Sequence, residues 1–147
     1  MNKDLLSPCG LYCGACGILI ADRTNDHVLK GKLAKAYGVA VDDIRCNGCL
    51  SEKVFVYCRV CPIKKCSSGK GYEGCYQCDA FPCEHVDHFP VEEGKRIIMR
   101  SIPEWRSLGT EKWLENEETR YKCLSCHSPL FRGARKCRIC ETPFVDQ

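Results

Sequence analysis

Apolar residues recur at helical spacing early in the chain, between residues 26 and 37. They follow the i, i+4, i+7, i+8 order of a single helix face. Asn25 or Asp26 can cap the start of this helix, and Gly38 fits its end. We expect the helix over 26–37 to supply much of the ordinary hydrophobic packing. Its apolar face consists of Leu29, Leu33, Ala36 and Tyr37.

A second region of helical pattern lies between residues 92 and 114. The stretch 92–100 reads as one helix, and the spacing Ser101-Ile-Pro-Glu104 is that of a capping box, which predicts a new helix start. Gly109 interrupts the pattern, and Thr110 restarts it. The apolar residues of this region are Ile97, Ile98, Trp105, Leu108, Trp113 and Leu114.

Between these regions the apolar pattern is short and broken. The segment 53–57 (KVFVY) is β-branched and aromatic, which predicts a strand. Pro62 and Pro82 are placed to open single helical turns. The longest apolar run, 54–58, is far below the roughly 20 residues of a membrane-spanning helix. With so few large apolar residues, we expect coordination bonds rather than an apolar core to hold the chain together.

Cysteine dominates the chemistry of the chain, with 15 residues in 147. The number is odd, and the N-terminal sequence MNKDLLSPCG has no apolar run typical of a signal peptide. In a reducing compartment such thiols act as metal ligands rather than disulfide partners. We therefore expect a cytoplasmic metal-binding protein.

The segment 121–144 carries the most specific motif. A K-C-x2-C-x2-P unit occurs twice with a period of 14, and its two C-x2-C pairs are separated by ten residues. This arrangement is typical of a zinc ribbon, with two knuckles on facing β-hairpins. The predicted zinc ligands are Cys123, Cys126, Cys137 and Cys140.

Eleven cysteines precede the ribbon, and eleven does not divide into sites of four. A C-x2-C-x4-C unit occurs twice between residues 58 and 83, 17 positions apart. Pairing the knuckles gives one site of Cys13, Cys16, Cys46 and Cys49. A second site would consist of Cys58, Cys61, Cys75 and Cys78. The remainder would be Cys9, Cys66 and Cys83, to which His85 or His88 could add a ligand.

Two alternatives to structural zinc stay open. Four thiolates also hold iron–sulfur clusters, so an electron-carrying iron–sulfur protein is the second candidate, although the ferredoxin spacing is absent. The spacing C-x3-C-x2-C at 9–16 is that of radical enzymes that split S-adenosylmethionine. Their barrels need roughly 200 residues or more, so the length of 147 residues counts against that class.

Charge bears on the choice of partner. The formal net charge is +3, but three zinc sites of four thiolates would change it by −6, to about −3. A globally basic nucleic-acid-binding protein is therefore not indicated. From 120 to 140, however, there are six basic residues and no acidic ones. A nucleic-acid contact at this tip would use Arg132, Arg135, Lys136 and Arg138.

Several short motifs, taken together, resemble a cysteine-rich prokaryotic family, domain of unknown function 3795. They are CGLYCGAC at 9–16, CNGCLS at 46–51, CPIKKC at 61–66, CYQCDAFPC at 75–83 and GTEKWL at 109–114. The resemblance covers residues 9 to about 118. It implies a cytoplasmic protein with zinc ligands at those cysteines, and it implies no established activity.

These observations combine into one prediction. We expect an α+β protein, in which a small irregular metal-stapled domain with several short helices and zinc knuckles (residues 1–118) is followed by a β-hairpin zinc ribbon (residues 119–147). We expect structural zinc sites, no catalysis, and a role as an adaptor that contacts a protein or a nucleic acid.

Overall fold

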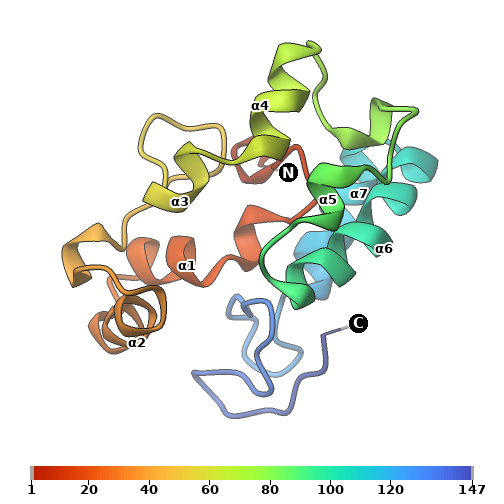
Figure 1. Ribbon diagram of the computed structural model, residues 1–147. Coiled ribbons are helices and arrows are strands. Elements are labelled where there is room, and N and C mark those ends of the chain that lie inside the picture. The colour runs from red at the N-terminus through yellow and green to blue at the C-terminus, as the bar shows by residue number, and fades with distance from the viewer. Residues whose placement is uncertain (1, 147) are drawn as a thin grey trace.

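The computed structural model describes residues 2–146. Regular structure in this part of the chain is helical, and no strand occurs in it beyond two isolated bridges, Lys122–Pro129 and Lys136–Pro143. The predicted α+β class is therefore corrected to a mostly helical fold (Figure 1). The helices are α1 (Gly17–Arg23), α2 (His27–Tyr37), α3 (Val56–Arg59), α4 (Pro62–Gly69), α5 (Glu84–Asp87), α6 (Glu92–Leu108) and α7 (Thr110–Arg120). Short 3-10 turns are η1 (Lys3–Leu5), η2 (Cys13–Ala15), η3 (Val41–Asp43) and η4 (Cys75–Gln77).

Helices α6 and α7 build the larger apolar core. The rings of Trp105 and Trp113 stack with centroids 4.1 Å apart, and Tyr76 covers Trp105 at 4.4 Å. Gly109, at φ +81°, lets the chain turn between the two helices. The apolar interior is thus larger than the sequence pattern suggested. Its fully buried residues include Val86, Ile97, Ile98, Ile102, Trp105 and Trp113.

The predicted helix start at Ser101 is wrong, because α6 runs unbroken through it with Pro103 inside the helix. The Ser101 hydroxyl makes tertiary contacts instead of a cap. It donates to the Gly10 carbonyl at 2.7 Å and accepts from the Trp113 indole N–H at 2.9 Å. Burial of the helix face on both sides of Pro103 offsets the loss of the backbone hydrogen bond that proline cannot make.

A buried ionic group also joins α6 to α7. The Glu117 side chain is fully buried and accepts from Arg100 at 2.5 Å and from Arg120 at 2.9 Å. Both arginines also bind Glu104. Because a buried carboxylate is costly without such partners, this group fixes how the two helices pack.

A smaller apolar cluster lies around α1 and α2. The prediction of a helix over 26–37 is confirmed, since Asp26 caps α2 by accepting the Leu29 N–H and Gly38 ends it at φ +67°. Its share of the packing is smaller than expected, because in α2 only Leu29 and Ala34 are buried. Most of this cluster comes from α1 and from the segment around Val54.

The strand predicted over 53–57 is wrong. Val54 and Phe55 are buried in succession rather than alternately, and α3 begins at the next residue. The Phe55 ring packs edge-on against Tyr37, with centroids 5.2 Å apart. Burial of two adjacent side chains does not suit a strand with one exposed face. Pro62 opens a helix as predicted, although α4 is longer than a single turn. The same prediction for Pro82 is wrong, because α5 begins two residues later, at Glu84.

The C-terminal segment after α7, which lies at the bottom of Figure 1, contacts residues between 12 and 26. The Arg132 N–H donates to the Ala15 carbonyl at 2.9 Å, and Arg138 pairs with Asp26 at 2.6 Å. Helix α7 extends two residues beyond 118, and the division into two folding units stays a prediction. Within residues 2–146, every helix is too short or too polar to traverse a lipid bilayer.

Candidate metal centres

The four predicted ribbon ligands converge. All four sulfur atoms lie within 4.8 Å of one another, and in the described part of the chain this is the one group of three or more metal-binding side chains that does so. The Sγ atoms of Cys123 and Cys140 are 3.5 Å apart, and those of Cys126 and Cys137 are 3.6 Å apart. Four thiolates around zinc at about 2.3 Å in a tetrahedron would have sulfur–sulfur distances of about 3.8 Å. The group therefore fits a single four-coordinate ion.

The internal repeat explains this convergence. In each unit the residue after the second cysteine takes a left-handed conformation, with His127 at φ 60° and Glu141 at φ 62°. The N–H of that residue donates at 2.9 Å to the carbonyl of the first cysteine, Cys123 or Cys137. The two units therefore form matching knuckles. Isolated bridges replace the predicted β-hairpins, because each unit has a single paired position flanking its knuckle.

The surroundings of two ribbon thiols, Cys137 and Cys140, favour the thiolate form. Burial would raise the pKa of Cys137, but the Ser128 hydroxyl at 3.2 Å and the Ile139 N–H at 3.4 Å outweigh it and lower that pKa to about 6. Hydrogen bonding by Thr142 lowers the pKa of Cys140. Because metals bind thiolates, these contacts prepare the site for a cation.

A second set of thiols gathers around α1. The N–H of Cys49 donates to Sγ of Cys13 at 3.4 Å, which joins the first two cysteine motifs. Burial and the charge of Cys16 raise the pKa of Cys13 to about 12. One packed cluster contains the predicted set Cys13, Cys16, Cys46 and Cys49, together with Cys58. Without a bound metal ion, the buried Cys13 thiol therefore stays protonated at neutral pH.

Arg132 reaches this set from the ribbon. Its guanidinium donates to the Tyr12 carbonyl at 2.7 Å. Burial opposes the charge of Arg132, whereas ionisation of the nearby Cys16, Cys13 and Cys9 thiols raises its pKa. The ribbon therefore places a positively charged side chain beside the thiols around α1. The sequence carries no local signal for this contact, because the two segments are more than a hundred residues apart.

A third set of thiols lines a pocket beside α4 and α5. Its cysteines are Cys66, Cys75, Cys78 and Cys83, which is a different grouping from the predicted one. Cys58 instead packs with the thiols around α1, and Cys61 lines a different pocket together with Cys49. His85 lies at the edge of the four-cysteine pocket, whereas His88 is not part of its lining.

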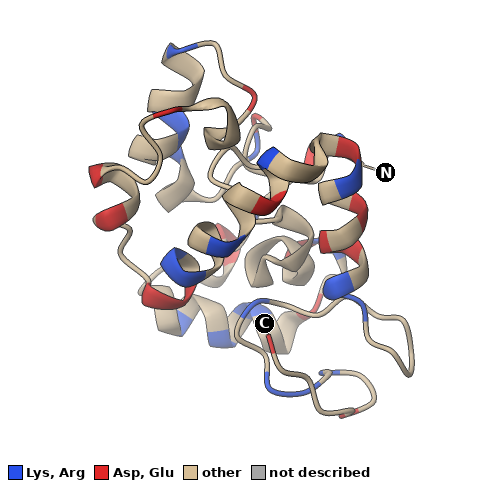
Figure 2. Cartoon of the chain, turned by 90° about the vertical axis from the view of Figure 1, so that its right-hand side faces the viewer, with Lys and Arg blue, Asp and Glu red and all other residues tan. Residues whose placement is uncertain are grey.

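Most of the basic residues proposed for nucleic-acid contact are engaged within the chain. Arg132 and Arg138 bind the first part of the protein, as described above, and Lys136 pairs with Glu141 at 2.7 Å. The exposed Arg135 side chain makes no ion pair with residues 2–146. Both acidic and basic positions occur along the helices (Figure 2).

Taken together, a small helical fold, fifteen free thiols and one converged four-thiol group define a cysteine-rich protein with a candidate metal centre. Residues 5–88, more than half of the chain, match the family described as "Protein of unknown function (DUF3795)". The chain therefore belongs to this family. The motifs between 9 and 83 lie in the matched range, and GTEKWL at 109–114 lies outside it. No curated protein and no solved structure matches the chain.

Proposed function

We propose that this protein is a structural zinc-binding protein that acts as a non-catalytic adaptor. The observation that carries the proposal is the convergence of the four ribbon thiols on one point. Four cysteines close the coordination sphere, which is typical of structural zinc, whereas catalytic zinc keeps one position open for water or substrate. The remaining eleven cysteines belong to further metal sites in the helical part.

The ribbon surface favours a protein partner. Each knuckle presents an aliphatic side chain to solvent, with Leu124 89% exposed and Ile139 58% exposed. In the same module Lys136 and Arg138 are held in ion pairs, which leaves little free positive charge for phosphates. We therefore propose that the two knuckle tips contact a protein. A nucleic-acid partner stays a prediction, and it would depend on Arg135.

Metal analysis tests the proposed zinc site. We expect protein purified under reducing, oxygen-free conditions to contain zinc, and Cys126→Ser to contain about one zinc fewer per chain. The neighbouring Ser125→Ala is the matched control, since it leaves all four thiols in place. Equal zinc in the wild type and in Cys126→Ser would contradict the proposal.

Fluorescence anisotropy with a labelled single-stranded RNA and a labelled DNA duplex tests the choice of partner. We expect no salt-sensitive binding to either probe. Binding that weakens with salt and disappears in Arg135→Glu, but persists in Leu124→Ser, would favour the nucleic-acid partner over the protein partner.

An iron–sulfur protein is the second candidate, and the four-cysteine pocket favours it for the reasons given below.

A further inference from the structure

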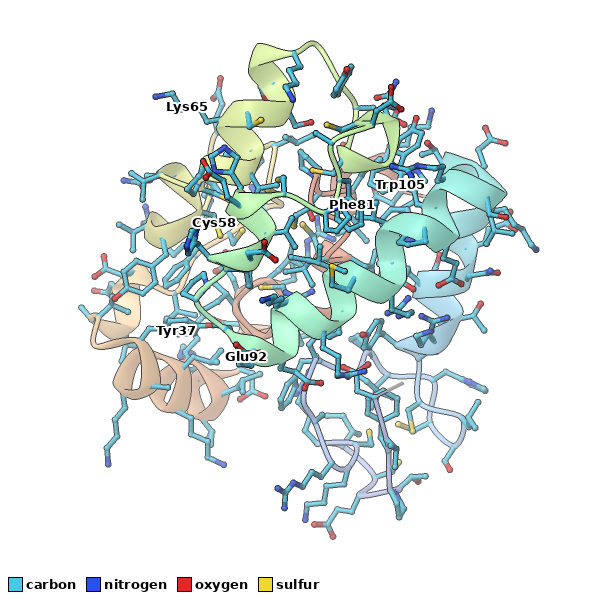
Figure 3. All side chains as sticks on the ribbon, turned by 45° about the vertical axis from the view of Figure 1, so that its right-hand side comes forward. Tyr37, Cys58, Lys65, Phe81, Glu92 and Trp105 are labelled. Carbon is cyan, nitrogen blue, oxygen red and sulfur yellow. The ribbon has the colours of Figure 1, made fainter. Side chains whose placement is uncertain are left out.

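Four thiols from three elements surround one cavity of about 200 Å³. Cys66 lies in α4, Cys75 begins η4, Cys78 directly follows η4, and Cys83 is the residue before α5. The polypeptide thus meets the cavity at three places within 18 residues, in α4, at η4 and before α5. In Figure 3 the labelled Phe81, another lining residue, lies in the loop between η4 and α5. The four cysteines are therefore a tertiary arrangement and not a single knuckle.

The spacing of these thiols differs from that of the ribbon. The ribbon sulfurs already stand at the distances that one zinc ion requires. No three of the pocket thiols converge to within 4.8 Å, although the structure describes all four. They stand around an open volume that would hold several water molecules at about 30 Å³ each. A single ion would leave most of that volume empty, whereas a cluster of several atoms would fill it.

The lining of the cavity also suits an inorganic cluster. Ile63, Ala80 and Phe81 contribute apolar surface beside the thiols. The Lys70 ammonium lies 3.6 Å from Sγ of Cys78, where it donates a hydrogen bond to the sulfur. Hydrogen bonds to ligating sulfurs are one means by which proteins tune iron–sulfur clusters.

We propose that Cys66, Cys75, Cys78 and Cys83 form a second metal centre, separate from the ribbon, and that this centre holds a four-iron, four-sulfide cluster. Each iron takes one cysteine thiolate, so the four ligands match the four irons. The proposal concerns binding of the cluster and is independent of whether the ribbon holds zinc.

Oxygen-free reconstitution of the full chain with ferrous iron and sulfide tests the centre. After gel filtration we measure iron, acid-labile sulfide, zinc and absorption at about 400 nm. We expect Cys66→Ser/Cys83→Ser to contain about four irons and four sulfides fewer per chain than the wild type. The matched variant Cys58→Ser/Cys61→Ser, which changes the two cysteines of the tandem repeat that do not line the cavity, should keep these four irons. The two tryptophan indole NMR signals verify that each variant is folded.

Three outcomes would overturn the proposal. Unchanged iron in Cys66→Ser/Cys83→Ser would reject the ligand set. Loss of zinc rather than iron in this variant would reject the cluster. Loss of the same irons in Cys58→Ser/Cys61→Ser alone would reject the proposed ligands in favour of the set predicted from sequence, Cys58, Cys61, Cys75 and Cys78.

Lys70→Met gives an independent measurement, because it keeps all four thiols. We expect unchanged iron content and a shifted reduction potential, whereas an unchanged potential would contradict the assigned contact with Cys78. A ribbon variant such as Cys126→Ser should lose zinc and keep iron. Failure of the zinc proposal can therefore be told apart from failure of the cluster proposal.

Discussion

Loss of a single ribbon ligand should unfold the ribbon and leave the helices intact. Apart from its thiols, the buried cluster at the centre of the ribbon contains Leu130 alone. Burial of one leucine contributes about 1.5–3 kcal/mol. A structural zinc contributes about 10–16 kcal/mol in small modules. Because the contribution of the metal to stability is several times larger than that of the buried leucine, Cys137→Ser should leave residues 121–144 without a stable fold.

The two tryptophans provide the internal reference for this experiment. The Trp113 indole N–H donates to Ser101 at 2.9 Å and that of Trp105 donates to Thr110 at 3.0 Å, so both signals report on the contact between α6 and α7. In ¹⁵N–¹H correlation spectra of Cys137→Ser, we expect the ribbon amides to move to random-coil positions. Both indole signals should keep the positions that they have in the wild type.

Leu124→Ser is the control for this prediction, since it changes an exposed residue of the same knuckle and spares the thiols. It should keep a dispersed ribbon spectrum and its full zinc content. If the Cys137→Ser ribbon lost its zinc and still gave dispersed signals, the reasoning that metal rather than packing folds the ribbon would be refuted.

Three further variants test the contacts that hold the helical part together. Glu117→Gln leaves Arg100 without its buried partner and should lower the free energy of unfolding in urea by about 2–4 kcal/mol, somewhat below a fully buried pair because the arginine is partly exposed. Burial opposes ionisation of Asp22, but the Cys46 N–H and two lysines lower its pKa. The stability that Asp22 contributes is therefore present above the ordinary pKa of about 3.9 and is lost as pH falls through the lower folded pKa. Asp22→Asn should therefore be less stable than the wild type at neutral pH, and the difference should vanish in acid; a constant difference would contradict this. Arg132→Gln should release the ribbon and speed its proteolysis, whereas Arg135→Gln, which changes an exposed arginine, should not.

Sequence reasoning succeeded where the signal is local. The ribbon ligands lie within 18 residues of one another and repeat with a period of 14, so spacing alone brings the pairs into matching knuckles. The ends of α2 follow from Asp26 and Gly38, whose capping effects act over one helical turn. In both cases the structure depends on neighbours along the chain.

Sequence reasoning failed where a residue's partner lies far away along the chain. Ser101 fits a capping box by spacing, yet its hydroxyl binds Gly10, 91 positions earlier. The grouping of the eleven N-terminal thiols by knuckle pairs stays a prediction, but it gave no hint of the pocket that Cys66, Cys75, Cys78 and Cys83 line, because this pocket forms only where α4, η4 and α5 pack together. A spacing rule carries no information about that packing.

The expectation that metal replaces an apolar core also needs revision, because the core positions the thiols. The Ser101 hydroxyl holds the carbonyl of Gly10, the residue after Cys9, and Ser7 lies 3.3 Å from the Cys9 sulfur. The N–H of Cys75 donates to the Pro8 carbonyl at 2.8 Å, so the same short segment also holds the four-cysteine pocket. Since α6 anchors this segment from the buried side, removal of metal from the helical part should loosen the thiol loops while the α6–α7 pair remains packed. Apolar packing therefore sets the positions of these sulfurs, so that any metal bound in the helical part would add to the packed core rather than replace it.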